Sequence, residues 1–225
     1  MPEWWTYTPG DFLMYSPRVY ARLLAGYQRD LLPAQAGALA VAVAVAALVR
    51  SRVEWRGRAV SAMLAAGWAF VAWAYFVERY ATIDWAASWF AGAFAVQALL
   101  LLAVGTLGGA LVPDPRAGRA ARGAQALLLF ALFVQPALGA VLAGDVAMAA
   151  LAGVLPDPTA VATLAFLLMV RGRARWMLLA TPLLWCVASG VLAWARGSAD
   201  ALVTLGAAAL ALGLAAAQRR DPERP

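Results

Sequence analysis

Seven long apolar segments, separated by short charged loops, constrain the fold of this chain more than any other feature. Charged residues make up 13% of the 225 residues, whereas a soluble domain carries about 25%. A helix of about 20 apolar residues matches the hydrocarbon core of a bilayer. The sequence therefore predicts an all-α integral membrane protein, a seven-span helical bundle within residues 31–218. The predicted spans lie near residues 31–49, 59–77, 89–112, 125–144, 146–170, 176–195 and 201–217.

The arginines alternate between the loops in the way that orients a membrane protein. The loops after spans one, three and five, together with the C-terminal tail, hold 13 arginines and four acids. The other loops and the N-terminal region hold five arginines and eight acids. By the positive-inside rule the N-terminus lies outside and residues 219–225 form a cytoplasmic tail. We expect a bacterial inner (cytoplasmic) membrane. No nucleic-acid partner is predicted, because the basic residues sit in short loops rather than in a polar domain.

Residues 1–30 are too polar to span and are predicted to form an extracytoplasmic interfacial segment. Ser16 and Pro17 are a favourable N-cap and first-turn pair for a helix that continues to Asp30. Its arginines and its apolar residues fall on opposite faces, which predicts an amphipathic helix lying in the interface, as an anchor or as a lid. Aromatic residues suited to the headgroup level precede or open it, namely Trp4, Trp5, Tyr7, Phe12 and Tyr15.

The fifth span is predicted to be broken near its outer end. The segment Leu155-Pro156-Asp157-Pro158-Thr159 interrupts it, and the twelve residues 159–170 then continue without a charge. Twelve helical residues cover about 18 Å, little over half of a hydrocarbon core of about 30 Å. A helix starting at Pro158 would therefore begin inside the membrane zone. Its N-terminus would favour an anion or a polar group there, as in transporters with discontinuous helices.

The candidate ligand-binding residues are Asp157, Thr159, Asp145 and Gln135. Asp157 precedes Pro158 and can cap the half-helix, and this capping role alone is the alternative interpretation. Asp145 is expected near the same outer opening, where the two carboxylates could instead attract a cation or an amine. Gln135 precedes Pro136, whose expected helix kink could help to form a cavity beside the broken span.

The residue inventory argues against catalysis. The chain has no histidine, and Cys186 is its single cysteine, so histidine-ligated metals and thiolate clusters are excluded. Every acid lies in a loop, a tail or the end of a span, which weighs against a buried proton relay. We therefore predict no enzyme activity, no catalytic residues, no metal and no cofactor.

Several local motifs resemble those of a bacterial multi-spanning membrane family of unknown function, domain of unknown function 6064. They are Tyr27 with Pro33-Ala34-Gln35, Gln135-Pro136-Ala137-Leu138-Gly139, the broken-span motif 155–159, and Pro182-Leu183-Leu184-Trp185. The resemblance implies the multi-spanning architecture and no activity.

Two functions remain open from the sequence. The first is an accessory or scaffold subunit that packs against another membrane protein or against itself, favoured by alanine- and glycine-rich spans. The second is a small-solute permease or binding protein that uses the half-helix N-terminus at Asp157 and Pro158.

Overall fold

The computed structural model describes residues 13–198 and 200–219, and in these residues it forms helices, connecting loops and no β-strands. The aromatic residues Trp4, Trp5, Tyr7 and Phe12 and the tail residues 220–225 lie outside the described part of the chain. The α-helices are α1 (Pro17–Asp30), α2 (Leu32–Arg50), α3 (Arg56–Phe70), α4 (Ala87–Leu100), α5 (Gly118–Leu129), α6 (Gln135–Ala143), α7 (Pro156–Met169), α8 (Ala174–Ala195) and α9 (Asp200–Arg219).

Three π-helical segments extend α-helices. They are η3 (Val71–Val77) after α3, η5 (Leu101–Leu107) after α4, and η6 (Phe130–Val134) between α5 and α6. The last one accommodates Pro136, which has no N–H to donate. In this wider register the N–H of Gln135 donates to the carbonyl of Phe130, five residues earlier. Two 3-10 turns, η4 (Tyr80–Thr82) and η7 (Val146–Met148), lie in loops.

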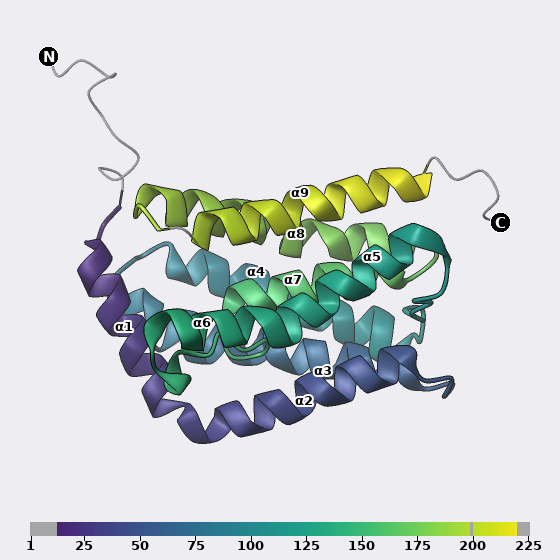
Figure 1. Cartoon of the computed structure of the whole chain (residues 1–225), viewed down its shortest axis with the longest axis horizontal. Coiled ribbons are helices and arrows are strands. Elements are labelled where there is room, and N and C mark those ends of the chain that lie inside the picture. The colour runs from purple at the N-terminus through teal and green to yellow at the C-terminus, as the bar shows by residue number, and fades with distance from the viewer. Residues whose placement is uncertain (1–12, 199, 220–225) are drawn as a thin grey trace, which may run out of the picture.

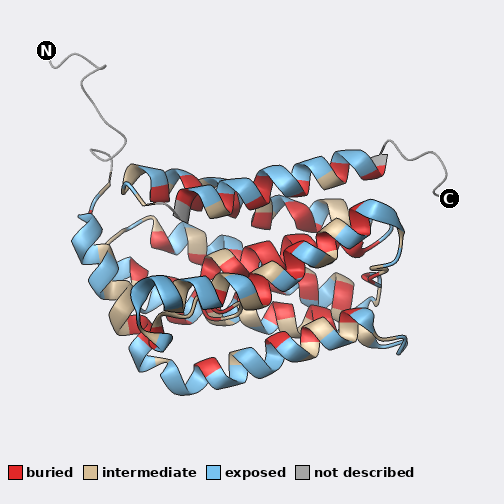
Figure 2. Cartoon of the chain, viewed as in Figure 1, coloured by how far each residue is buried: buried red, intermediate tan, exposed pale blue. Residues whose placement is uncertain are grey.

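Six helical stretches in the described chain are long and apolar enough to cross a membrane, and they indicate a membrane protein. They are Leu32–Arg50, Arg56–Thr82, Ala87–Leu107, Gly118–Ala143, Ala174–Ala195 and Ala201–Gln218. Large apolar side chains such as Leu99, Leu142 and Leu202 are exposed on their outward faces (Figure 2), which suits contact with lipid rather than with water. The remaining apolar helix, α7, has 14 residues. The fifth of the seven predicted spans thus lacks a helix of spanning length, and the seventh crossing stays a prediction.

Helix α7 is the centre of the bundle. All its residues except Asp157 are buried, and α3, α5, α8 and α9 pack around it (Figure 1). A helix that is apolar on every side is expected to be buried against protein or lipid on every side. Here other helices enclose it, and in Figure 2 its ribbon is almost entirely buried.

The two ends of the bundle differ in charge. The loops between α2 and α3, between η5 and α5, and between α7 and α8 lie together at one end, and α1 lies at the other (Figure 1). Those three loops and their flanking turns carry ten of the arginines that the sequence assigns to the cytoplasm. The structure therefore gathers the arginine-rich loops at a single end, as the alternation in the sequence requires.

Helix α1 has the predicted bounds and cap. Ser16 is its N-cap, with the Ser16 hydroxyl 3.4 Å from the backbone N–H of Val19, and Pro17 is its first residue. Tyr27 and Gln28 on its inner face are buried, whereas Arg18 and Arg22 are exposed. Its placement in a membrane interface remains a prediction.

Candidate functional site

The N-terminus of α7 differs from the prediction by two residues. The helix begins at Pro156, with Leu155 as the N-cap residue, so Asp157 lies in the first turn and not at the capping position. The carboxylate of Asp157 accepts hydrogen bonds from Trp185 Nε1 at 2.9 Å and from Ser189 Oγ at 2.6 Å. Both donors lie on α8, four residues apart and hence on the same helix face. Asp157 thereby joins α7 to α8.

A small polar cavity lies beside Asp157. Its volume is about 20 Å³, which is room for about one water-sized group. It is lined by Tyr20, Tyr75, Phe76, Tyr80, Pro156, Asp157, Trp185, Ser189, Leu192 and Arg196. A carboxylate, a guanidinium and three phenol hydroxyls therefore meet in one place, between α1, the continuous helix formed by α3 and η3, the turn η4, α7 and α8.

At this cavity, tyrosine hydroxyls from α1 and the residue just before it meet those of η3 and η4. The hydroxyls of Tyr20 and Tyr75 are 3.2 Å apart, and those of Tyr15 and Tyr80 are 2.5 Å apart. The guanidinium of Arg196 lies 4.1 Å from the ring centre of Tyr20, and Nη1 of Arg196 donates to the Tyr15 hydroxyl at 3.4 Å. Burial raises the pKa of Tyr20 to about 12, so this hydroxyl stays neutral and able to donate at physiological pH.

Thr159 has a structural role in the turn that leads into α7. Its buried hydroxyl donates to the carbonyl of Leu155 and accepts from the N–H of Gly153 at 2.7 Å. One turn later, the Thr163 hydroxyl donates to the Thr159 carbonyl and accepts from Trp68 Nε1, each at 2.8 Å. Thr159 is therefore hydrogen-bonded within the protein and does not line the cavity at Asp157.

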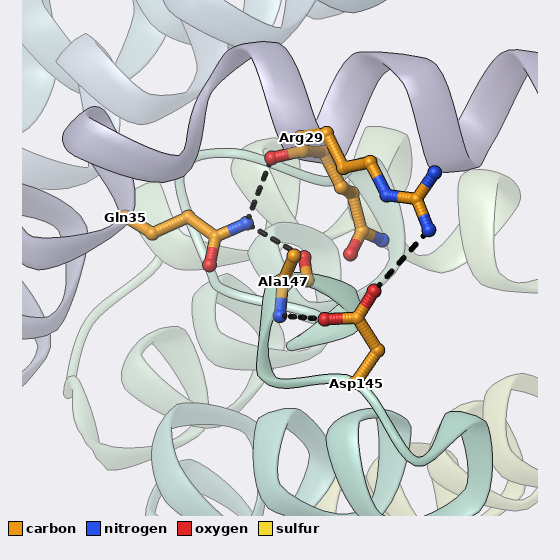
Figure 3. Close-up of polar contacts among 5 residues, drawn as sticks. Arg29, Gln35, Asp145 and Ala147 are labelled. Atoms are coloured by element: carbon orange, nitrogen blue, oxygen red, sulfur yellow. Dashed lines mark hydrogen bonds and ion pairs between the residues drawn. The ribbon is translucent and has the colours of Figure 1, made fainter.

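Asp145 belongs to a second polar group, shown in Figure 3. One carboxylate oxygen caps η7 by accepting from the N–H of Ala147 at 2.9 Å, and the other lies 3.5 Å from Arg29 Nη2. Gln135 is half-buried at the start of α6, and its side-chain oxygen is buried without a hydrogen-bond partner among the described residues. Neither residue lines the cavity. Of the four predicted ligand-binding residues, only Asp157 does so.

Side chains of α1 and α2 donate hydrogen bonds to the backbone of the segment between α6 and α7, which contains the 3-10 turn η7. The Gln35 amide nitrogen donates to the carbonyls of Ala147, at 2.8 Å, and of Gln28, at 3.2 Å (Figure 3). The Tyr27 hydroxyl donates to the Val154 carbonyl at 2.8 Å. In the amide orientation that satisfies both the side-chain oxygen and the side-chain nitrogen of Gln28, this nitrogen also donates to the Ala147 carbonyl, at 2.7 Å. These contacts satisfy backbone carbonyls that a loop inside a membrane protein cannot leave unpaired.

A separate apolar groove runs over the outer surface between α3 with η3 and α4. Its volume is about 730 Å³. Its walls are mainly alanine, and exposed large side chains lie along it. The lining residues are Ala62, Ala65, Ala66, Ala69, Ala72, Trp73, Val77, Ala91, Gly92, Ala95, Ala98, Leu99 and Leu102.

Comparison with known proteins identifies the family of this chain. Residues 18–224 match a protein-family model described as "Family of unknown function (DUF6064)". The protein belongs to the DUF6064 family. No curated protein and no solved structure matches the chain. The resemblance of the sequence motifs to this family is thereby confirmed.

The sequence contains a weak signal for the partners of Asp157. Trp185, Ser189 and Arg196 are spaced by four and seven residues, which places them on one face of a helix. That face carries a polar residue within an apolar helix and ends in an arginine, which indicates a polar contact there. Tyr15 was predicted only as an interfacial aromatic, since nothing in its local sequence indicates that it meets Tyr80.

Proposed function

We propose that this DUF6064 protein is a non-catalytic integral membrane protein of the bacterial inner membrane that serves as an accessory or scaffold subunit. The observation that carries the proposal is the alanine-lined groove between α3 with η3 and α4. The occupant that we propose is a transmembrane helix of another membrane protein.

The shape and chemistry of the groove support this occupant. From Ala62 to Val77 the lining covers about 20 Å along the helix, at about 1.5 Å per residue, which is most of a hydrocarbon core. Between membrane helices the hydrophobic effect contributes little, so association depends on close van der Waals packing, which small residues allow. The exposed side chains of Trp73 and Leu99 would add large apolar contacts to a helix lying in the groove.

We further propose seven crossings, with the N-terminus outside and the C-terminus in the cytoplasm. The common location of the arginine-rich loops supports this orientation. In the fifth crossing α7 would cover the cytoplasmic part, and the enclosed segment 145–155 would cover the outer part. An irregular backbone is tolerated at membrane depth only where protein surrounds it, and α1 and α2 supply such contacts.

The scaffold proposal can be tested with two exposed alanines of α4. Ala95 lines the groove, whereas Ala93 is exposed and does not. A photo-crosslinking residue at position 95 should capture one membrane protein, and a mild-detergent preparation should contain it in stoichiometric amount. Ala95→Trp should abolish co-purification, and Ala93→Trp should preserve it. Cross-links from position 95 to lipid alone would count against the proposal, as would equal amounts of the partner protein co-purifying with both variants.

A second candidate function is the binding of a small solute from the outside. It is favoured by the convergence of Asp157, Arg196 and tyrosine hydroxyls on the cavity at the α7 N-terminus. Since the cavity holds about 20 Å³, a solute larger than a single small ion requires α1 to move.

Thermal shifts with sodium, ammonium, methylamine and acetate would test this second candidate. A stabilising solute should lose its effect in Asp157→Asn and keep it in Asp145→Asn, which changes a carboxylate outside the cavity. The solute proposal fails if none of these probes shifts the melting temperature of the wild type.

A further inference from the structure

An arginine-lined pocket lies at the end of the bundle opposite α1. It is formed by the C-terminus of α2, the loop that precedes α5, and the first turns of α5, and its volume is about 320 Å³. This volume is within the range of small-molecule sites, which begins at about 300 Å³. The lining residues are Arg50, Pro115, Arg116, Gly118, Arg122 and Gln125.

The three arginines of this pocket lack protein partners among the described residues. Arg50, Arg116 and Arg122 come from three different elements, and their exposed guanidinium groups make no ion pair and no hydrogen bond with the part of the chain that the structure describes. The lining contains no acid. Asp114, which lies just before the pocket, is paired with Arg171 at 3.5 Å. The pocket therefore presents unneutralised positive charge.

The start of α5 is unfavourable without an anion. The N-terminal end of a helix carries a partial positive charge that favours acids and disfavours arginines. The first turn of α5 nevertheless contains no acid and begins Gly118-Arg119. Arg122 follows one turn later and lines the pocket. Local conflicts of this kind are expected at functional sites, and an anion held by the arginines would resolve this one.

We propose that this pocket binds a phosphate group, carried either by an anionic phospholipid headgroup or by a soluble phosphate compound. Guanidinium groups bind phosphate oxygens through two parallel hydrogen bonds. Basic pockets between membrane helices at the cytoplasmic side are suited to anionic headgroups. The site is independent of the alanine groove and of the cavity at Asp157, because it shares no lining residue with either.

The experiment uses the full-length protein in nanodiscs and a matched pair of variants. Arg122→Gln removes a lining charge, whereas Arg119→Gln removes a charge three residues earlier on the same helix that does not line the pocket. In one arm phosphatidylglycerol is added to phosphatidylcholine nanodiscs. In the other arm the nanodiscs contain phosphatidylcholine alone, and inorganic phosphate or glycerol 3-phosphate is titrated. Thermal stabilisation and native mass spectrometry report binding.

We expect Arg122→Gln to weaken binding about fivefold, since one arginine near anionic groups contributes about 1 kcal/mol. Arg50→Gln combined with Arg116→Gln should weaken it about 25-fold, and Arg119→Gln should leave it unchanged. Binding in the first arm alone identifies a lipid headgroup, and binding in the second arm identifies a soluble phosphate. The proposal is overturned if neither arm shows binding, or if Arg119→Gln and Arg122→Gln weaken it equally. In either case the arginines serve only to orient the chain in the membrane.

Discussion

Gln97 of α4 supplies the hydrogen bond that Pro182 removes from α8. Pro182 has no N–H, so the carbonyl of Leu178, four residues earlier, lacks its helical donor. The amide nitrogen of the fully buried Gln97 donates to that carbonyl at 3.0 Å. Gln97→Leu keeps a similar volume and removes the donor. Leaving a buried carbonyl unpaired costs about 1–3 kcal/mol, and hydrogen bonds between membrane helices contribute about 0.6 kcal/mol on average and up to about 1.7.

The expected net loss of stability is about 0.5–1.5 kcal/mol, because the Gln97 side-chain oxygen has no partner among the described residues and its removal offsets part of the cost. A double-mutant cycle isolates the contribution of the hydrogen bond from Gln97 to the Leu178 carbonyl. Pro182→Ala restores an N–H at position 182, so in that background Gln97→Leu should cost about 1 kcal/mol less. Unfolding in mixed micelles, followed by tryptophan fluorescence and circular dichroism, measures all four proteins. Equal costs in both backgrounds, within about 0.3 kcal/mol, would refute the reasoning.

Three further predictions concern the hydrogen bonds of α1 to the segment before α7, the packing of α3 and the orientation of the chain. Tyr27→Phe should leave the Val154 carbonyl unpaired, lower stability by about 1–2 kcal/mol and speed hydrogen exchange in residues 145–155. Unchanged exchange in these residues would contradict a stabilising role for the Tyr27 hydrogen bond. Gly57→Ala should destabilise by about 1–3 kcal/mol, because its Cβ would collide with the carbonyl oxygen of Leu111. The matched Gly37→Ala, with open space around its Cβ, should be neutral or stabilising in the same unfolding assay. Reporter fusions after Arg58, Arg122 and Arg175 should report the cytoplasm, and fusions near Asp84 and Asp200 the outside; one reversed site would break the proposed topology.

The helices were largely predictable because length and hydropathy are local properties. The first predicted span, 31–49, coincides with the helix Leu32–Arg50, and the sixth, 176–195, with the helix Ala174–Ala195. The proline-rich break before α7 was also visible in the sequence. The central position of α7 was not, because an apolar helix has the same composition whether lipid or other helices surround it.

The candidate site was predictable only in part, because its contacts join residues far apart in the sequence. Asp157 was identified from its position before Pro158, but its donors Trp185 and Ser189 lie on α8. The contact between Tyr15 and Tyr80 spans 65 residues. Likewise, the alternation of arginines predicted which loops share a compartment. It could not indicate that Arg50 would meet Arg122 across a pocket, since that depends on how α2 packs beside the start of α5.

The short length of α7 gives α1 a structural role in the seven-crossing arrangement that we propose. The 14 residues of α7 would cover about 21 Å of the fifth crossing, which would leave about 9 Å of a 30 Å hydrocarbon core for the segment before it. Lipid cannot satisfy the backbone groups of that segment, and Tyr27 and Gln28 of α1 bond to them instead. In that arrangement the segment that precedes Asp157 requires protein contacts to its backbone, and α1 supplies them. A displacement of α1 as a whole that opens the cavity would also break these hydrogen bonds, which would couple access to Asp157 to the order of the segment before α7.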